Sequence, residues 1–303
     1  MQHLHAFVTL CAWVLYIAPL AAQETNAAET LSMRDGDRVV FLGNTFFERA
    51  LDYGHLETSL TLRWPEKKIT FRNLGWDGDT VYGHSRAGGR RRQLFGDAEE
   101  GFQRMMKHLN SEKPSVVFVA YGFNESFDGI QGLASFQKGL NRLLDRLENL
   151  SRQIVLITPP AVVVHDNSLN LMLGRYAEIL LETGRSRGHL VVDLFGDEAL
   201  NAPACRENGL HLSAAGYQKV AEIWVQKLKL PPVRIDLNNS RADKVRQAII
   251  KKNTLYFHRW RPRNDAFVFG ERRDEQKIAQ KEPLQFKPYI EQQEQRIRKF
   301  LKP

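Results

Sequence analysis

Residues 38–50 read RVVFLGNTFFERA, an apolar run that ends in a glycine and leads into a stretch with helical spacing. Such a run predicts a buried strand that turns sharply into a helix. Enzymes built on α/β sheets can hold a nucleophile in a turn of this kind. The turn here is Gly43-Asn44-Thr45, and the side-chain hydroxyl that it offers is that of Thr45.

Similar short apolar runs recur along the chain and are separated by amphipathic stretches. One stretch places Phe136, Leu140 and Leu143 on one helical face, and another begins at Ser213, a natural N-cap. Apolar strands alternating with amphipathic helices predict a three-layer α/β/α sandwich with a parallel, flavodoxin-like sheet, which binds ligands at the carboxyl ends of its strands. The expected strands are 38–42, 68–74, 115–121, 153–158 and 189–194.

The first 22 of the 303 residues differ from the rest of the chain. An apolar run at 6–18 followed by Pro-Leu-Ala-Ala is typical of a secretory signal cut near Ala22, and it favours a secreted or periplasmic protein of bacterial type. The alternative is a membrane anchor, although the run is short against the ~20 residues that span a bilayer. Residues 23–35 are polar and are expected to be a linker. After cleavage Cys205 is the one remaining cysteine, either a packed residue or a nucleophile.

The net charge of +8 belongs to the C-terminal part of the chain. Residues 240–303 hold 17 Lys and Arg against 8 Asp and Glu. We therefore expect a domain at 36–230 followed by a basic, aromatic extension at 231–303, with helices near 240–252 and 288–301. In an exported protein the basic charge does not indicate nucleic acid, which leaves contact with a polyanion or the cell envelope, or plain packing. The expected packing residues are Leu255, Tyr256, Phe257, Trp260, Phe267 and Phe269.

Four polar motifs lie at the ends of expected strands or before the last helix of the domain. They are LGNT (42–45), NLGWDGDT (73–80), YGFNES (121–126) and NGLHLSAAGY (208–217). In this order they resemble the four sequence blocks of the SGNH (GDSL-type) hydrolase family, over about residues 36–230. The resemblance implies that fold, and a secreted esterase that removes small acyl groups such as acetyl from carbohydrate or related esters through an acyl-enzyme.

The resemblance also implies roles for particular residues. Thr45 stands at the nucleophile position, His211 at that of the general base, and Asn208 at that of the residue that orients the histidine. An oxyanion hole and a substrate-binding site are implied for four further residues. They are Gly78, Asn124, Asn44 and Asp77.

Two of these positions depart from the family pattern. The family has serine where this chain has Thr45, whose methyl group stiffens the side chain and crowds the turn. The family has aspartate in a D-x-x-H run where this chain has Asn208, and an amide cannot stabilise an imidazolium as a carboxylate does. Glu207 could substitute only if the backbone turns it inward, and Glu125 replaces a further aspartate. A second hypothesis is therefore a non-catalytic module that binds a glycan or an envelope partner.

Each candidate also has a structural interpretation. Thr45 could form an ST-turn, His211 could cap a helix, and Asn124 could brace a loop, while Gly78 could serve the turn alone. Asp77 and Asp79 could bind a substrate hydroxyl or cap the next segment. The Arg90-Arg91-Arg92 run could be a solvated loop or hold an anionic substrate. The nine histidines lack metal-ligand spacing and no phosphate loop occurs, so no metal or cofactor is expected.

Overall fold

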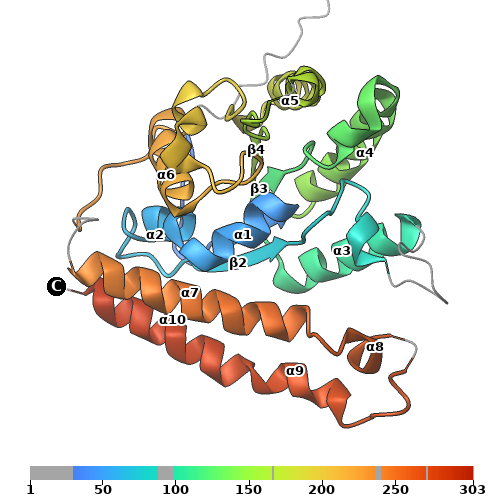
Figure 1. Ribbon diagram of the computed structural model, residues 1–303. Coiled ribbons are helices and arrows are strands. Elements are labelled where there is room, and N and C mark those ends of the chain that lie inside the picture. Colours follow the sequence, from blue (N-terminus) through green and yellow to red (C-terminus); the bar gives the residue numbers. More distant parts are fainter. Residues whose placement is uncertain (1–29, 88–97, 166, 236–239, 271, 303) are drawn as a thin grey trace, which may run out of the picture.

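A computed structural model describes residues 30–87, 98–165, 167–235, 240–270 and 272–302 (Figure 1). Five strands, all parallel to their neighbours, form one sheet in the order β2-β1-β3-β4-β5. This confirms the predicted α/β fold, and every strand lies where an apolar run predicted it. The strands are β1 (Arg38–Gly43), β2 (Thr70–Gly75), β3 (Val116–Ala120), β4 (Gln153–Ile157) and β5 (Leu190–Val192).

Helices cover both faces of this sheet and form the outer two layers (Figure 1). On one face Phe41 and Phe118 pack with Trp224, whose ring stacks on Phe118 at 4.7 Å between centroids. On the other face Val40 and Val117 belong to a second cluster. The first face is covered by α1 (Thr45–Tyr53), α2 (His55–Thr61) and α6 (Ala214–Lys227), and the second by α3 (Ala98–Glu112), α4 (Leu133–Glu148) and α5 (Ser168–Ser186). Short 3-10 turns are η1 (His84–Arg86), η2 (Glu125–Gly132), η3 (Glu198–Asn201), η4 (Pro203–Cys205) and η5 (Ala279–Lys281).

The described part of the N-terminal segment packs against the domain. Leu31 and Met33 are buried in the first cluster, and the Leu31 N–H donates to Leu228 O at 3.4 Å. Residues 30–35 of the expected linker thus pack on the core, because Leu31 and Met33 are apolar and bury their side chains in this cluster. The expected signal at 1–22 and the run at 90–92 lie outside the described residues.

The C-terminal extension consists of helices that lie along the β2 side of the sheet (Figure 1). Lys252 forms a buried ion pair with Glu57 of α2, and its Nζ also donates to Phe71 O of β2 at 3.2 Å. The helix that carries Lys252 therefore covers β2, an edge strand that would otherwise offer unpaired backbone groups. The helices are α7 (Ser240–Trp260), α8 (Asp265–Val268), α9 (Glu282–Gln285) and α10 (Lys287–Leu301).

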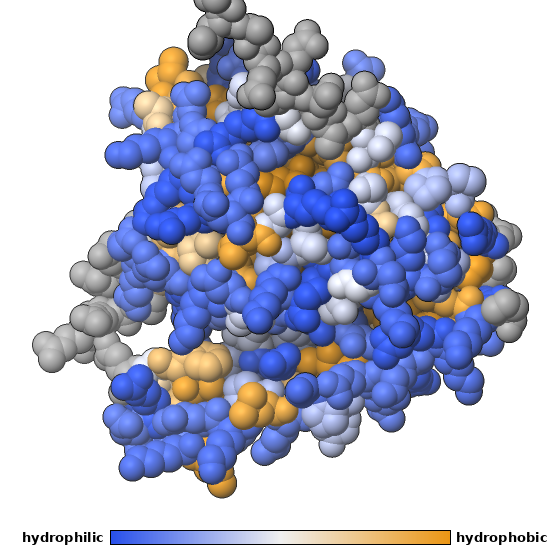
Figure 2. All heavy atoms as spheres, turned by 180° about the vertical axis from the view of Figure 1, so that it is seen from behind, coloured by the Kyte–Doolittle hydropathy of each residue, from blue (hydrophilic) through white to orange (hydrophobic). Residues whose placement is uncertain are grey.

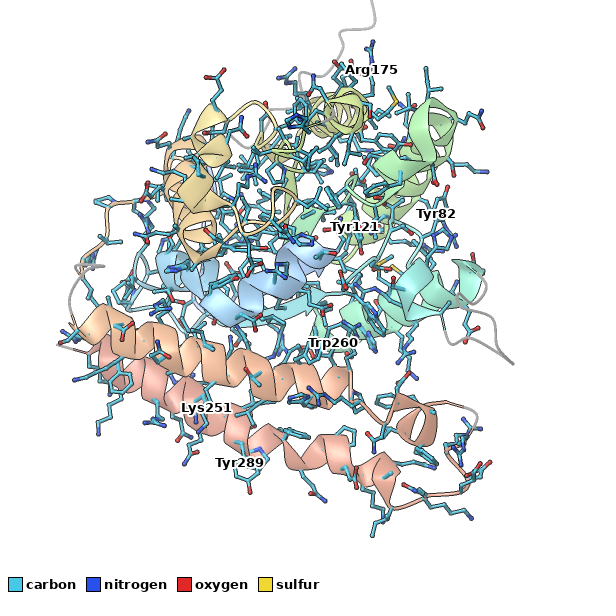
Figure 3. All side chains as sticks on the ribbon, in the orientation of Figure 1. Tyr82, Tyr121, Arg175, Lys251, Trp260 and Tyr289 are labelled. Atoms are coloured by element: carbon cyan, nitrogen blue, oxygen red, sulfur yellow. The ribbon has the colours of Figure 1, made fainter. Side chains whose placement is uncertain are left out.

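The first of these helices is longer than the predicted 240–252. Its apolar face continues through Tyr256 to Trp260, both of which are buried against the second cluster. Figure 3 shows Trp260 between α7 and the rest of the molecule. The helix ends just before Pro262, which cannot continue it.

One expected packing residue of the extension is not buried. Phe269 is 48% exposed, and the guanidinium of Arg104 lies over its ring at 6.0 Å from the centroid. Seen from behind, the surface is mostly hydrophilic and its apolar areas are scattered, some of them at the end where α8 and α9 lie (Figure 2). Contact of the basic extension with a polyanion stays a prediction. Among the described helices, none has the length and apolar character to cross a bilayer.

Candidate active site

The turn after β1 places Thr45 at the carboxyl edge of the sheet. Gly43 ends the strand, and a Cβ there would lie 2.4 Å from Ala120 O, so only glycine permits this close approach to β3. Asn44 is the N-cap of α1, and its Oδ1 accepts from Phe46 N at 3.1 Å. Thr45 is therefore the first residue of α1, with its hydroxyl beyond the end of an inner strand.

The Thr45 hydroxyl contacts the loop that follows β2. It donates a hydrogen bond to Asp77 Oδ1, and the backbone N–H of Gly78 donates to Thr45 Oγ1 at 3.3 Å. Neither contact involves the backbone of α1, so the alternative of an ST-turn is not what forms. Two of the four motifs therefore meet at one oxygen atom.

Gly78 lies next to this hydroxyl, and Asn124 lies beside Gly78. Gly78 has a φ of +71°, and a Cβ there would lie 3.3 Å from Ser85 Oγ and 3.9 Å from Asn124 Nδ2. The glycine therefore serves both the turn and the site. Among the described residues the Asn124 side chain makes no hydrogen bond, and its Oδ1 is buried without a partner. An N–H group and a side-chain amide beside a hydroxyl are the donors of an oxyanion hole.

Glu125 holds the Asn124 loop against the loop that follows β2. Its carboxylate accepts from Val81 N and from Gly122 N, each at 2.8 Å. Burial raises the pKa of Glu125 to about 7, against the hydrogen bonds from those backbone N–H groups, which lower it. The residue that replaces the usual aspartate is thus a brace between two site loops.

His211 lies in the loop before α6 and lines the same cavities as Thr45. The cap of α6 is Ser213, whose Oγ accepts from Gly216 N at 3.2 Å, so His211 does not serve as the cap. Burial and the charge of Arg49 lower the pKa of His211, while the carboxylates of Asp77 and Glu207 raise it. The imidazole is thus kept neutral near pH 7, as a general base must be.

Asn208 contacts the backbone of its own loop. Its Oδ1 accepts from Leu210 N at 3.3 Å and from His211 N at 2.9 Å. No hydrogen bond joins Asn208 to the imidazole among the described residues. The carboxylate of Glu207 forms an ion pair with Arg49 of α1. Neither Asn208 nor Glu207 therefore orients the His211 ring by a hydrogen bond, as the aspartate of a D-x-x-H run would.

Asp79 and Cys205 do not take part in the site. Asp79 is fully buried and accepts from Arg86 Nε at 2.6 Å and from the Tyr121 hydroxyl at 3.0 Å. It anchors the loop after β2 and does not reach a substrate hydroxyl. Cys205 is buried and free, which fits a packed residue.

Two cavities meet at Thr45, Arg49 and His211. The larger has a volume of about 360 Å³, and carboxylates, histidines and one face of α7 surround it. The smaller has about 40 Å³, where one water needs about 10–15 Å³, so it admits only a few heavy atoms. The larger is lined by Thr45, Glu48, Arg49, Leu51, Asp52, Asp77, His211, Thr254, Phe257 and His258. The smaller is lined by apolar and polar residues that include Asn44, Phe46, Phe123, Pro159, Pro160 and Leu212.

Several lining residues were not predicted from the sequence. Arg49 follows Thr45 by four residues on α1, and this spacing, which puts both on one helical face, could have indicated it. Thr254, Phe257 and His258 of α7 reach the site only through tertiary packing and had no local signal. In the part of the chain that the structure describes, no three His, Cys, Asp or Glu side chains gather as metal ligands.

A hydroxyl at a strand-to-helix turn, an N–H group and an amide close to it and a histidine at the same edge are the groups that acyl transfer requires. The chain matches the GDSL-like lipase/acylhydrolase family over residues 47–219, more than half of its length, and it belongs to that family. It is thus an enzyme that hydrolyses ester bonds. The matched span begins two residues after Thr45, so the threonine itself lies outside it.

Solved structures with the same fold share little sequence with this chain. A catalytic mutant of Axe2, an acetylxylan esterase from Geobacillus stearothermophilus, is 18% identical, with 68% of this chain and 100% of that chain covered and a TM-score of 0.53. BT4096, a gut microbial diltiazem-metabolizing enzyme, is 20% identical over 67% of this chain and 49% of that one, with a TM-score of 0.51. LAE5, from the metagenome of Lake Arreo in Spain, is 18% identical over 65% and 97%, with a TM-score of 0.51. At these identities the similarity concerns the fold alone. None of the curated proteins compared with the chain matches it.

Proposed function

We propose that this protein removes small acyl groups, acetyl above all, from carbohydrate or a related polar alcohol. The observation that carries the proposal is the position of Thr45 Oγ1. It lies beside Gly78 N and at the junction of a small cavity and a larger polar one. A small acyl group fits the small cavity, and an alcohol with several hydroxyl groups suits the larger one.

In this proposal Thr45 Oγ1 attacks the ester carbonyl and His211 accepts its proton. The carbonyl oxygen becomes an oxyanion, to which Gly78 N–H and the free amide of Asn124 donate. His211 then returns the proton to the leaving alcohol oxygen as the C–O bond breaks. Water attacks the acyl-threonine in a second round of the same steps and restores the hydroxyl.

The preference for carbohydrate rests on the walls of the larger cavity. Glu48, Asp52 and Asp77 offer acceptors for sugar hydroxyl groups, and Phe257 offers a ring face for the C–H side of a sugar. The acetylxylan esterase among the solved structures supports the same substrate class. Export to the periplasm or the medium is part of the proposal and rests on residues 1–22. N-terminal sequencing of the protein from its host would test cleavage near Ala22.

The decisive test compares wild type with Thr45→Ala and Thr45→Ser on p-nitrophenyl acetate and on acetylated xylo-oligosaccharide. We expect Thr45→Ala to lower kcat by at least about 10³-fold, since it removes the nucleophile. Thr45→Ser should keep or raise kcat, because the turn loses a methyl group that restricts χ1. Equal, background-level rates in wild type and Thr45→Ala would make the hydroxyl inert toward these esters, and a non-catalytic glycan-binding site would then be the better description.

A further inference from the structure

We propose that Asp77 is the catalytic carboxylate of this site and takes the place of the aspartate that a D-x-x-H run would have at Asn208. The inference rests on the proposed function, because it concerns how Thr45 and His211 work without that aspartate. It assigns to Asp77 a role beyond binding substrate. The negative charge thus stands on the loop after β2, where the D-x-x-H pattern would place it on the loop before His211.

Asp77 contacts Thr45 Oγ1, the atom that would attack the ester. The Thr45 hydroxyl donates to Asp77 Oδ1, so this carboxylate touches the oxygen that would attack the ester. Asp77 also lines the larger cavity together with Thr45 and His211. The hydrogen bond fixes the hydroxyl beside the N–H of Gly78, at 3.3 Å, against the rotation that a threonine side chain would otherwise have.

The two glutamates near the site are already paired, and Asp52, which is exposed, is not among the charges that act on His211. Glu207 forms an ion pair with Arg49, and Glu48 forms one with Arg261. Asp77 makes no ion pair among the described residues, and its negative charge is one of those that raise the pKa of His211. An unpaired carboxylate next to a histidine stabilises the imidazolium that forms when the ring takes a proton.

Opposing charges also face His211 and limit its basicity. Arg49 of α1 lowers the pKa of His211, while Glu207 of its own loop raises it. Around the larger cavity the remaining charged or titratable groups are Glu48 and Asp52 of α1 and His258 of α7. Of the carboxylates in this set, Asp77 is the one bonded to the nucleophile.

Contacts with α1 and with the C-terminal extension fix the position of Asp77. The Asp77 N–H donates to Glu48 Oε2 at 2.5 Å, and Glu48 is in turn paired with Arg261, just after α7. The guanidinium of Arg261 lies 4.2 Å from the ring centroid of Trp76, the residue before Asp77. The C-terminal extension therefore supports the loop that carries this carboxylate.

The proposed step balances without any further reactant. The Thr45 hydroxyl first turns its proton from Asp77 Oδ1 to His211. The bond from Thr45 Oγ1 to the carbonyl carbon then forms as this proton passes to His211, and the carbonyl electron pair moves to the oxyanion. The carboxylate of Asp77 then stabilises the imidazolium and takes no part in the proton transfer. When the C–O bond to the alcohol breaks, the imidazolium gives its proton to the leaving oxygen and becomes neutral again.

The test is Asp77→Asn, which keeps the size of the side chain and an Oδ1 acceptor for Thr45 but removes the charge. We expect kcat on p-nitrophenyl acetate to fall between about 10²- and 10⁴-fold, since the acid-to-amide change in the Ser-His-Asp proteases lowers it by about 10⁴. The matched control is Asp145→Asn on α4, an exposed carboxylate paired with Arg187 far from the site. It should retain wild-type kcat, and thermal unfolding should show that both variants fold.

The pH profile separates a catalytic charge from a merely structural contact. Activity needs neutral His211, so kcat/KM rises with pH through the pKa of His211. Removing the charge of Asp77 lowers that pKa further, and the acid limb of the Asp77→Asn profile should move to lower pH. A profile lowered in height without this displacement would overturn the proposal, because a purely structural loss does not change the titration of His211.

The failure of this inference can be told apart from the failure of the proposed function. Wild-type kcat in Asp77→Asn together with loss of activity in Thr45→Ala would keep the threonine esterase and reject Asp77. Wild-type kcat in Thr45→Ala would reject the proposed function itself. A loss in both variants, with the displaced acid limb in Asp77→Asn, is the result that we expect.

Discussion

Two loops bring polar residues to Thr45 and are held in different ways. The loop after β2 (76–79) is anchored on both sides of Asp77: the Trp76 ring packs edge-to-face on Trp260 at 5.4 Å, and Asp79 is buried against Arg86. In the loop before α6 (207–211), Asn208 accepts from two backbone N–H groups of the same loop, and the ion pair of Glu207 with Arg49 and the bond from Val163 N to Gly209 O, at 2.8 Å, join it to the domain. Asp77, which accepts from the Thr45 hydroxyl, stands on the loop that the C-terminal extension anchors, and contacts from this later part of the chain fix its direction.

The largest expected effect comes from breaking the buried anchor of the first loop with Asp79→Asn. Arg86 is fully buried, and the change leaves its charge without a counter-ion. The free energy of unfolding should fall by about 3–5 kcal/mol, measured by urea denaturation, and activity should fall with it as the loop loosens. Asp145→Asn, which breaks an exposed pair with Arg187, should cost far less. If both variants lost the same small amount of unfolding free energy, the hydrogen bond from Arg86 to Leu74 O, at 2.7 Å, would be enough to hold the guanidinium.

A smaller effect is expected from Glu125, which ties the first loop to Asn124. Its pKa is about 7 in the folded chain and near 4.5 in the unfolded one, so the folded state binds more protons between these values. Stability should therefore decrease as pH rises from about 4.5 to 7, by up to about 3 kcal/mol from this group.

The variant Glu125→Gln isolates that contribution from other titrating groups. Its amide does not titrate, so its free energy of unfolding should lack this part of the pH dependence. The free energy of unfolding of wild type minus that of the variant should then decrease from pH 5 to pH 8, as measured by urea unfolding at each pH. A constant difference would mean that Glu125 ionises in the folded state as readily as in the unfolded chain.

The sequence was sufficient for the sheet because each strand is a local apolar run. It was also sufficient to predict that Thr45, Gly78, Asn124 and His211 lie at one edge of the sheet, since parallel strands carry the residues after them to that edge. The structure brings Thr45 and His211 to the same two cavities, and Gly78 and Asn124 to adjacent positions.

Other features depend on contacts between distant parts of the chain. The pairing of Glu48 with Arg261 joins residues far apart in sequence, and no local pattern indicates it. The direction of Asp77 depends on that pairing and on the Trp76 contacts, so the residue could be selected while its contact with Thr45 could not. Phe269 shows the converse, because an aromatic residue in an apolar-looking stretch was expected to pack and is exposed.

The smallest effect is expected from returning a carboxylate to the second loop with Asn208→Asp. The new carboxylate would keep accepting from Leu210 N and His211 N, so it would stay on the backbone and not move under the imidazole. Its charge should raise the pKa of His211 slightly, which moves the acid limb of kcat/KM to higher pH and changes kcat by less than about 5-fold. In an Asp77→Asn background the same change should recover only a small part of the lost kcat. Full recovery would show that the loop before α6 can place a carboxylate as well as the loop after β2, and the different anchoring of the two loops would then not explain where the charge stands.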